Sequence, residues 1–79
     1  MLYLSGTIAD VTREAGHAIL ILDTGRGLHR LQADAGLLFD GLTVLFGDDD
    51  WVGKAIAVQC NGDQLSTIEI PGAPPNYTI

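Results

Sequence analysis

Few side chains in this 79-residue chain could act in nucleophilic or metal chemistry. Cys60 is the single cysteine, and His17 and His29 are the two histidines that could serve it as a base. Cys60 ends an apolar stretch typical of a strand, where a lone cysteine is usually a small core residue. The two histidines lack the His-x-x-x-His spacing of a metal site, and both lie near predicted turns. We therefore expect an inert thiol, two surface histidines and no metal.

Two further segments resemble ligand-binding loops only in part. The three aspartates at 48–50 could supply oxygen ligands to a hard cation, but an EF-hand loop needs alternating ligands and a glutamate at position twelve, where this chain has Gln59. Gly53 and Lys54 lack the glycine-rich lead and the following Ser or Thr of a phosphate loop. We predict a solvated acidic turn, a lysine at a strand edge and no cofactor.

Residues 20–25 have the sequence Leu-Ile-Leu-Asp-Thr-Gly, which resembles the active-site motif of the aspartic proteases. In the retroviral type each of two subunits supplies one aspartate, and two close carboxylates share a proton to form the acid and the base. The resemblance implies a dimeric hydrolase acting through Asp23. However, Arg26 stands where the family usually has Ala or Ser, and residues 27–40 show no glycine-rich flap. We favour the alternative, in which Asp23 caps a hairpin turn.

The charge balance limits the classes of partner. Ten acids oppose four Lys and Arg residues, for a formal net charge of -6. This disfavours nucleic acid, because such binding depends on cations that neutralise phosphates. The first residues show no signal peptide or membrane span, and one cysteine fits a reducing compartment, so we predict a cytoplasmic location. The 47% hydrophobic content is high for a small domain and indicates self-association or a protein partner.

Alternating or continuous apolar segments predict five strands. They cover residues 2–8, 18–22, 28–33, 54–59 and 65–70. Gly6 falls on the inward face of the first strand, where a missing side chain lets the strand coil or another strand approach closely. Val11 breaks the alternation, which predicts a bulge near Ala9 and Asp10.

A helix is predicted between the third and fourth strands, over residues 35–46. Asp34 can cap its start and Gly47 can end it. Its apolar stripe consists of Leu38, Leu42, Leu45 and Phe46. Residues 42–46 would also suit a strand, because Gly36 and Gly41 weaken the helix.

The chain is too short for a second core, so we predict one domain over residues 1–71. A proline-rich run at 71–75 ends the regular structure, and residues 72–79 are expected to form a loose tail. Trp51 could close the barrel from within or anchor an interface, and we favour burial in the core.

Three strands, a helical connection and two more strands form the element order of the OB-fold, a five-stranded Greek-key barrel. Residues 1–32 resemble the start of the anticodon-binding OB domain of class II aminoacyl-tRNA synthetases. The likeness lies in Gly6-Thr7-Ile8, Val11, Arg13, Gly16, the apolar run to Leu22, Asp23-Thr24-Gly25 and Leu31-Gln32. It implies a mainly β, OB-like barrel with one short helix between strands three and four. In that family, strands two and three present an aromatic side chain that stacks on nucleobases and basic side chains that hold phosphates. Here these two strands contain no aromatic residue.

These observations predict a non-enzymatic binding or assembly module, with a protein partner favoured over nucleic acid. The candidate partner-binding residues are Arg13, His17, Arg26, His29 and Arg30. We expect the two hairpin ends to gather this positive charge on one side of an acidic molecule. A single-stranded nucleic-acid-binding OB domain, the dimeric hydrolase and a structural homo-oligomer remain as alternatives.

Overall fold

A long, bent first strand joins the two halves of the sheet. The computed structural model describes residues 2–47 and 50–79, with the backbone alone described for 73–77. β1 (Leu2–Glu14) pairs antiparallel with β4 (Ala55–Asn61) through its first half and with β2 (His17–Asp23) through its second half. One extra residue, Ala9, shifts the register with β2 between Ile8 and Asp10. This confirms the predicted bulge, at the point where β1 changes partners.

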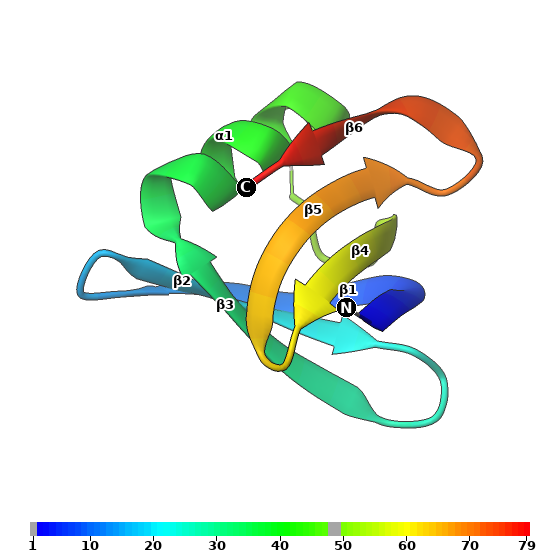
Figure 1. Ribbon diagram of the computed structural model, residues 1–79, viewed down its shortest axis with the longest axis horizontal. Helices are drawn as coiled ribbons and strands as arrows, with labels where there is room; N and C mark the ends of the chain where they lie inside the picture. Colours follow the sequence, from blue (N-terminus) through cyan, green and yellow to red (C-terminus); the bar gives the residue numbers. More distant parts are fainter. Residues whose placement is uncertain (1, 48–49) are drawn as a thin grey trace.

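The sheet closes into a barrel through its third and fifth strands. β2 pairs antiparallel with β3 (Leu28–Asp34), and β4 pairs antiparallel with β5 (Gln64–Ile70). β3 and β5 then meet in parallel at Gln32 and Gln64, where the Gln32 N–H donates to the Asp63 carbonyl at 2.8 Å. The predicted mainly β fold, a closed five-stranded barrel with one short helix between strands three and four, is confirmed (Figure 1).

The helix α1 (Ala35–Phe46) packs against the barrel core. Its first turn is capped by Asp34, whose Oδ2 accepts the Leu37 N–H at 3.1 Å. Its last turn ends at Gly47, which has a φ of 83° and donates its N–H to the Thr43 carbonyl. The predicted helix is confirmed, and the alternative of a strand over residues 42–46 is wrong. The cause is that both ends are capped and one face of the helix is covered by the barrel.

The core is a single apolar cluster to which all five barrel strands and α1 contribute. Its largest fully buried side chains are Ile8, Leu20, Leu22, Leu31, Leu38, Leu42, Ile56, Ile68, Val58 and Cys60. Close approach of the backbone at Gly6 completes the packing, because a Cβ on Gly6 would lie 2.1 Å from the Asp23 carbonyl oxygen. The predicted close approach at this glycine is therefore confirmed.

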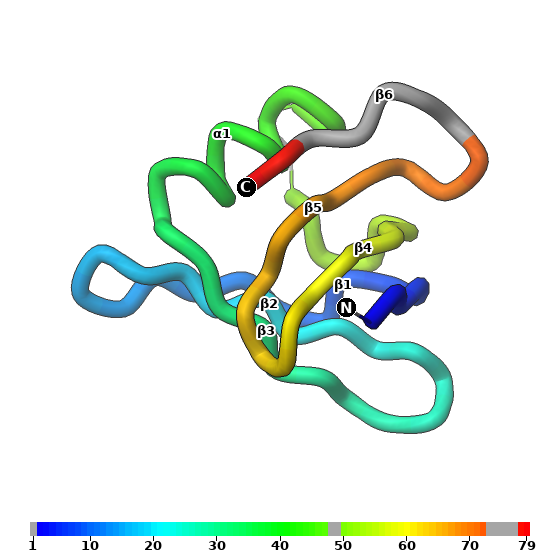
Figure 2. The backbone as a smooth tube through the Cα atoms, viewed as in Figure 1, coloured from blue at the N-terminus to red at the C-terminus, as the bar shows by residue number. Residues whose placement is uncertain are grey.

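The end of the chain continues the sheet. Residues 72–79, which we expected to form a loose tail, instead include β6 (Ala73–Thr78), antiparallel to β5. The register shifts between Glu69 and Ile70, and the adjacent prolines fall in the unpaired stretch. An edge strand tolerates proline at such an irregularity, because no ladder hydrogen bond is needed there. Ile79 packs against the core, and the chain ends close to α1 (Figure 2).

Candidate functional site

The five candidate partner-binding residues do not form one group. Arg13 and His17 flank the turn between β1 and β2, whereas Arg26 lies in the turn between β2 and β3, close to His29 and Arg30. These turns stand at opposite ends of β2, to the left and the lower right in Figure 1. The expectation that both hairpin ends share one side is therefore wrong. The reason is geometric, since consecutive hairpin turns of a meander must lie at opposite ends of the strand between them.

Arg13 is directed toward the helix. Its guanidinium carbon lies 4.9 Å from the centre of the Phe39 ring, a cation–π arrangement. The Phe39 ring in turn lies 5.4 Å from that of Trp51 and is tilted by 37°. Trp51 is half-buried against the core, and its Nε1 donates to the Gly47 carbonyl at 2.9 Å. Arg13 and Trp51 thus belong to one packed group at the α1 side of the barrel, and this takes Arg13 away from the other cations.

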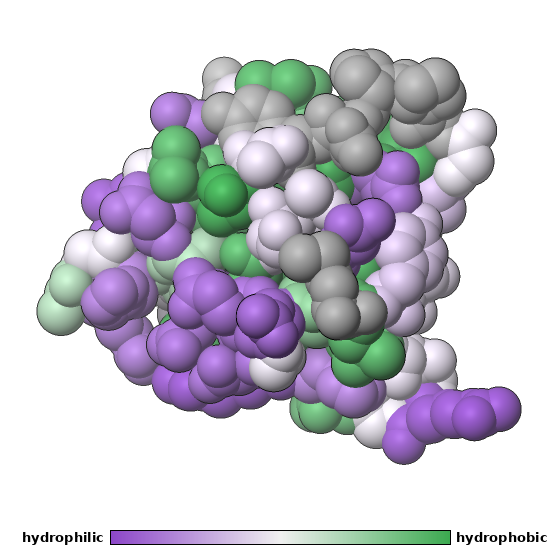
Figure 3. Space-filling model, viewed as in Figure 1, coloured by the Kyte–Doolittle hydropathy of each residue, from purple (hydrophilic) through white to green (hydrophobic). Residues whose placement is uncertain are grey.

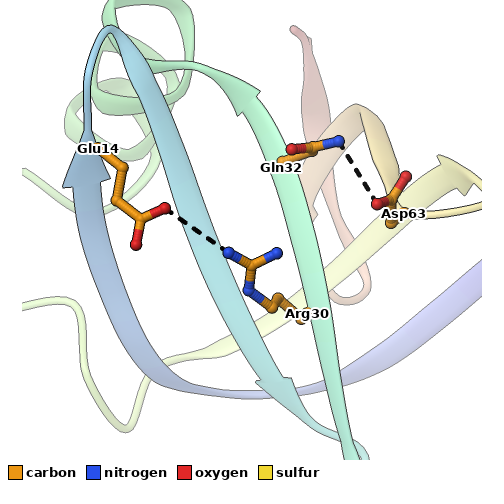
Figure 4. A network of polar contacts seen from close by, with 4 residues as sticks. All are labelled: Glu14, Arg30, Gln32 and Asp63. Atoms are coloured by element: carbon orange, nitrogen blue, oxygen red, sulfur yellow. Dashed lines mark hydrogen bonds and ion pairs between the residues drawn. The ribbon is translucent and has the colours of Figure 1, made fainter.

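Arg30 forms an ion pair on the outer face of the sheet. Its Nη2 lies 3.6 Å from Oε2 of Glu14, and the pair spans β2 from β3 to β1 (Figure 4). Ile19 lies on this same outer face, in register with Gln32, yet only 4% of it is exposed. Both charged side chains are more than half exposed, at 59% and 63%, so the ion pair contributes at most about 1 kcal/mol. Its main effect is to shield the apolar middle of β2.

The outer face around this pair is acidic. Asp10 is in register with Ile21 and therefore lies in the same row as Arg30, and Glu14 lies in one row with His17 and Asp34. Asp23 is in register with Leu28 on the same face, so four carboxylates lie with one guanidinium and one exposed imidazole on the outer face of β1–β3. A phosphate chain laid across this face would meet more negative than positive charge.

One contact joins β3 to the turn between β4 and β5. Beside the backbone bond to the Asp63 carbonyl, Nε2 of Gln32 donates to Oδ2 of Asp63 at 3.4 Å (Figure 4). The backbone groups of Gln32 therefore point away from β2. Alternate residues of a strand point their N–H and C=O to the same side, so Arg30 and Leu28 also direct theirs away from β2.

Those backbone groups form an open edge, by which we mean the side of residues 28–30 that faces away from β2. Among the described residues, β3 is paired on that side only at Gln32, so Leu28 and Arg30 each present a free N–H and a free carbonyl. Leu28 is also 67% exposed, the largest exposure of any big apolar side chain in the described part. This edge is not among the sites expected from the sequence, where its one local sign is a leucine directly after a glycine-rich turn.

The open edge continues into a positively charged hairpin tip. Residues 24–30, which we call the basic tip, contain Arg26 and Arg30 and no acid. Asp23 precedes them, and its Oδ1 accepts the Gly25 N–H at 2.9 Å, which confirms that Asp23 caps the turn. The hairpin end projects as a hydrophilic extension at the lower right of Figure 3. His29, also exposed, lies on the opposite face of β3 from Arg30.

Three further titratable or nucleophilic side chains are buried or form hydrogen bonds within the fold. Cys60 is fully buried as predicted, and desolvation raises the pKa of its thiol. The Tyr3 hydroxyl donates to the Glu69 carboxylate, and this hydrogen bond, with smaller contributions from desolvation and the carboxylate charge, raises the pKa of Tyr3. Asp50 accepts the Val52 N–H at 3.0 Å, whereas Asp48 and Asp49 lie outside the described residues.

Neither a metal site nor a membrane-spanning helix occurs in the described ranges. Across residues 2–47 and 50–79, no three His, Cys, Asp or Glu side chains are placed to hold an ion. Within the same ranges, no helix has the length and hydropathy to cross a bilayer. The chain matches no protein-family model, no curated protein and no solved structure.

Proposed function

We propose that this chain is a small, non-enzymatic, OB-like module that binds a protein partner. The observation that supports it most is the open edge of β3 beside the basic tip. An exposed strand edge is a template for pairing with another polypeptide chain. The OB-like assignment is supported by the closure of β3 on β5 and by the position of α1 between β3 and β4.

A polypeptide suits this edge better than a nucleic acid does. Leu28 and Arg30 offer two carbonyl acceptors as well as two N–H donors. Another peptide backbone satisfies both kinds of group, whereas a phosphate has acceptors only. The strands β2 and β3 also hold no aromatic side chain on which bases could stack.

Selection from a displayed library of random twelve-residue peptides tests the proposal. Wild type is compared with Arg26→Glu, which reverses a charge at the basic tip, and with Arg13→Glu, which makes the same charge change at the opposite end of β2. We expect wild type and Arg13→Glu to enrich the same peptides and Arg26→Glu to lose them. No enrichment, or equal enrichment by all three proteins, would overturn the proposal.

A parallel titration addresses the nucleic-acid alternative. Fluorescence anisotropy is measured with labelled single-stranded oligothymidylate and oligouridylate from low to physiological salt. We expect no binding at any salt concentration. Binding that weakens steeply as salt rises would replace the protein partner with a nucleic acid.

A further inference from the structure

We infer that the partner presents an extended acidic segment, which adds as one more strand along the open edge of β3. This inference rests on the proposed function and specifies the binding mode and the chemistry of the partner. It draws on three features of the described residues, namely the unpaired backbone groups, the place where the edge ends and the charge beside it.

The unpaired backbone groups define the mode of binding. Leu28 and Arg30 are non-hydrogen-bonded partners of Asp23 and Ile21 in the β2–β3 ladder, so their N–H and C=O groups are available on the other side. A strand laid along this side completes the ladder without breaking any bond within the fold. The outer-face side chains of Leu28 and Arg30 would then lie beside those of the added strand.

The length of the added segment is set by the barrel closure. At Gln32 the edge is already occupied by Asp63, so a new strand can run only from the hairpin tip to that point. This leaves two edge-facing residues, Leu28 and Arg30, which correspond to about four or five residues of an added strand. A short linear segment therefore fits, whereas a long strand of a folded sheet would meet the turn between β4 and β5.

The charge of the basic tip selects an acidic segment and opposes pairing between two copies. Arg26 and Arg30 are exposed, and residues 24–30 contain no carboxylate. If two copies paired through this edge, their arginines would be brought together and would repel each other. A carboxylate opposite Arg30 would instead gain an ion pair, in competition with Glu14, whose distance of 3.6 Å marks a loose partner.

The inference is tested with a synthetic peptide. The probe is a capped seven-residue peptide of alternating glutamate and valine, titrated into the ¹⁵N-labelled chain and followed by amide chemical shifts. The shifts should be largest at Leu28 and Arg30, and the amide exchange of both residues should slow. A matched peptide with lysine in place of glutamate should bind at least about tenfold more weakly. Equal binding of the two peptides, or shifts centred on the turn between β1 and β2, would overturn the inference.

Backbone methylation separates strand addition from simple charge attraction. Two isomers of the peptide carry N-methyl groups on all glutamates or on all valines, which removes the donors from one edge of the strand at a time. We expect a third form, N-methylated on every residue, to lose binding, because it keeps all the carboxylates but has no N–H donor on either edge, whichever way the strand runs along β3. Retention of binding by the fully methylated peptide would overturn strand addition, and the two isomers show which edge faces β3.

A protein variant provides an independent control. Leu28→Pro removes an N–H that no hydrogen bond among the described residues uses, and Leu28→Ala keeps that N–H. We expect loss of peptide binding in the first variant and less than about threefold weakening in the second, both with dispersed amide spectra. Equal affinity of the two variants would contradict the inference. If displayed peptides are enriched but the acidic peptide fails, the inference falls and the proposed function stands; if the library fails as well, both fall.

Discussion

Replacing Gly6 by alanine should destabilise the barrel strongly. The added Cβ would lie 2.1 Å from the carbonyl oxygen of Asp23, 2.8 Å from its carbonyl carbon and 3.0 Å from the Cα of Thr24. All three neighbours are backbone atoms at the end of β2, so no side chain can rotate to relieve the overlap. The strands β1 and β2 would have to move apart by roughly 1 Å to restore ordinary contact.

The cost can be estimated from this geometry. Overpacking of a well-packed interior costs about 1–3 kcal/mol. Gly6→Ala should cost about 3 kcal/mol, the upper end of this range, because its backbone neighbours are rigid. A domain of this length has a free energy of unfolding of about 4–12 kcal/mol. With a urea dependence of about 1–1.5 kcal/mol per molar, the midpoint should fall by about 2–3 M.

Urea unfolding followed by the fluorescence of Trp51 measures this effect. The matched control is Gly36→Ala in α1, where the nearest atom to the new Cβ, apart from the adjoining residues and the helix backbone, is the capping Oδ2 of Asp34 at 3.3 Å. That variant gains at most about 1 kcal/mol from helix propensity and must shift the capping Asp34 oxygen slightly, so its free energy of unfolding should change by less than about 1 kcal/mol, well below the loss expected at Gly6. A Gly6→Ala free energy of unfolding within about 0.5 kcal/mol of the wild-type value would refute the close approach.

Three further predictions concern the helix cap and the two shifted groups. Asp34→Ala should lower the free energy of unfolding by about 1 kcal/mol in the same urea assay, because Asp34 caps α1; no change would contradict the cap. The pKa values of Tyr3 and Cys60 are higher in the folded chain than their ordinary values of 10.0 and 9.0. The stability that each group contributes is therefore complete below its ordinary pKa and is lost as the pH rises through its higher folded pKa. Tyr3→Phe should therefore flatten the fall in stability above pH 10, and an unchanged slope would count against the Glu69 hydrogen bond. The Cys60 thiol should react with a thiol reagent at pH 8 only in urea, and fast reaction in buffer would show that it is not buried.

Features set by neighbouring residues could be predicted from the sequence. The bulge at Ala9 follows from a break in the alternation, and the turn at Asp23 follows from residue types within three positions. The helix could be placed by Asp34 and Gly47, which satisfy its ends.

Features set by distant pairing could not be predicted in this way. The open edge exists because β5 meets β3 only at Gln32, a register that depends on residues about thirty positions apart. The expected grouping of the positive charges was wrong because the β1–β2 turn and the β2–β3 turn lie at opposite ends of β2. The strand β6 was missed because prolines were taken as the end of pairing, although an edge strand accepts them at a register shift.

Amide hydrogen exchange along β3 of the free protein tests the open edge most directly. The structure predicts slow exchange at Leu31, whose N–H faces β2, and at Gln32, whose N–H donates to the Asp63 carbonyl. It predicts fast exchange at Arg30, whose N–H lies on the open edge. Protection of Arg30 in the free protein would mean that the edge is already covered. Fast exchange at Gln32 would mean that the barrel is not closed, and either result would contradict the proposed binding edge.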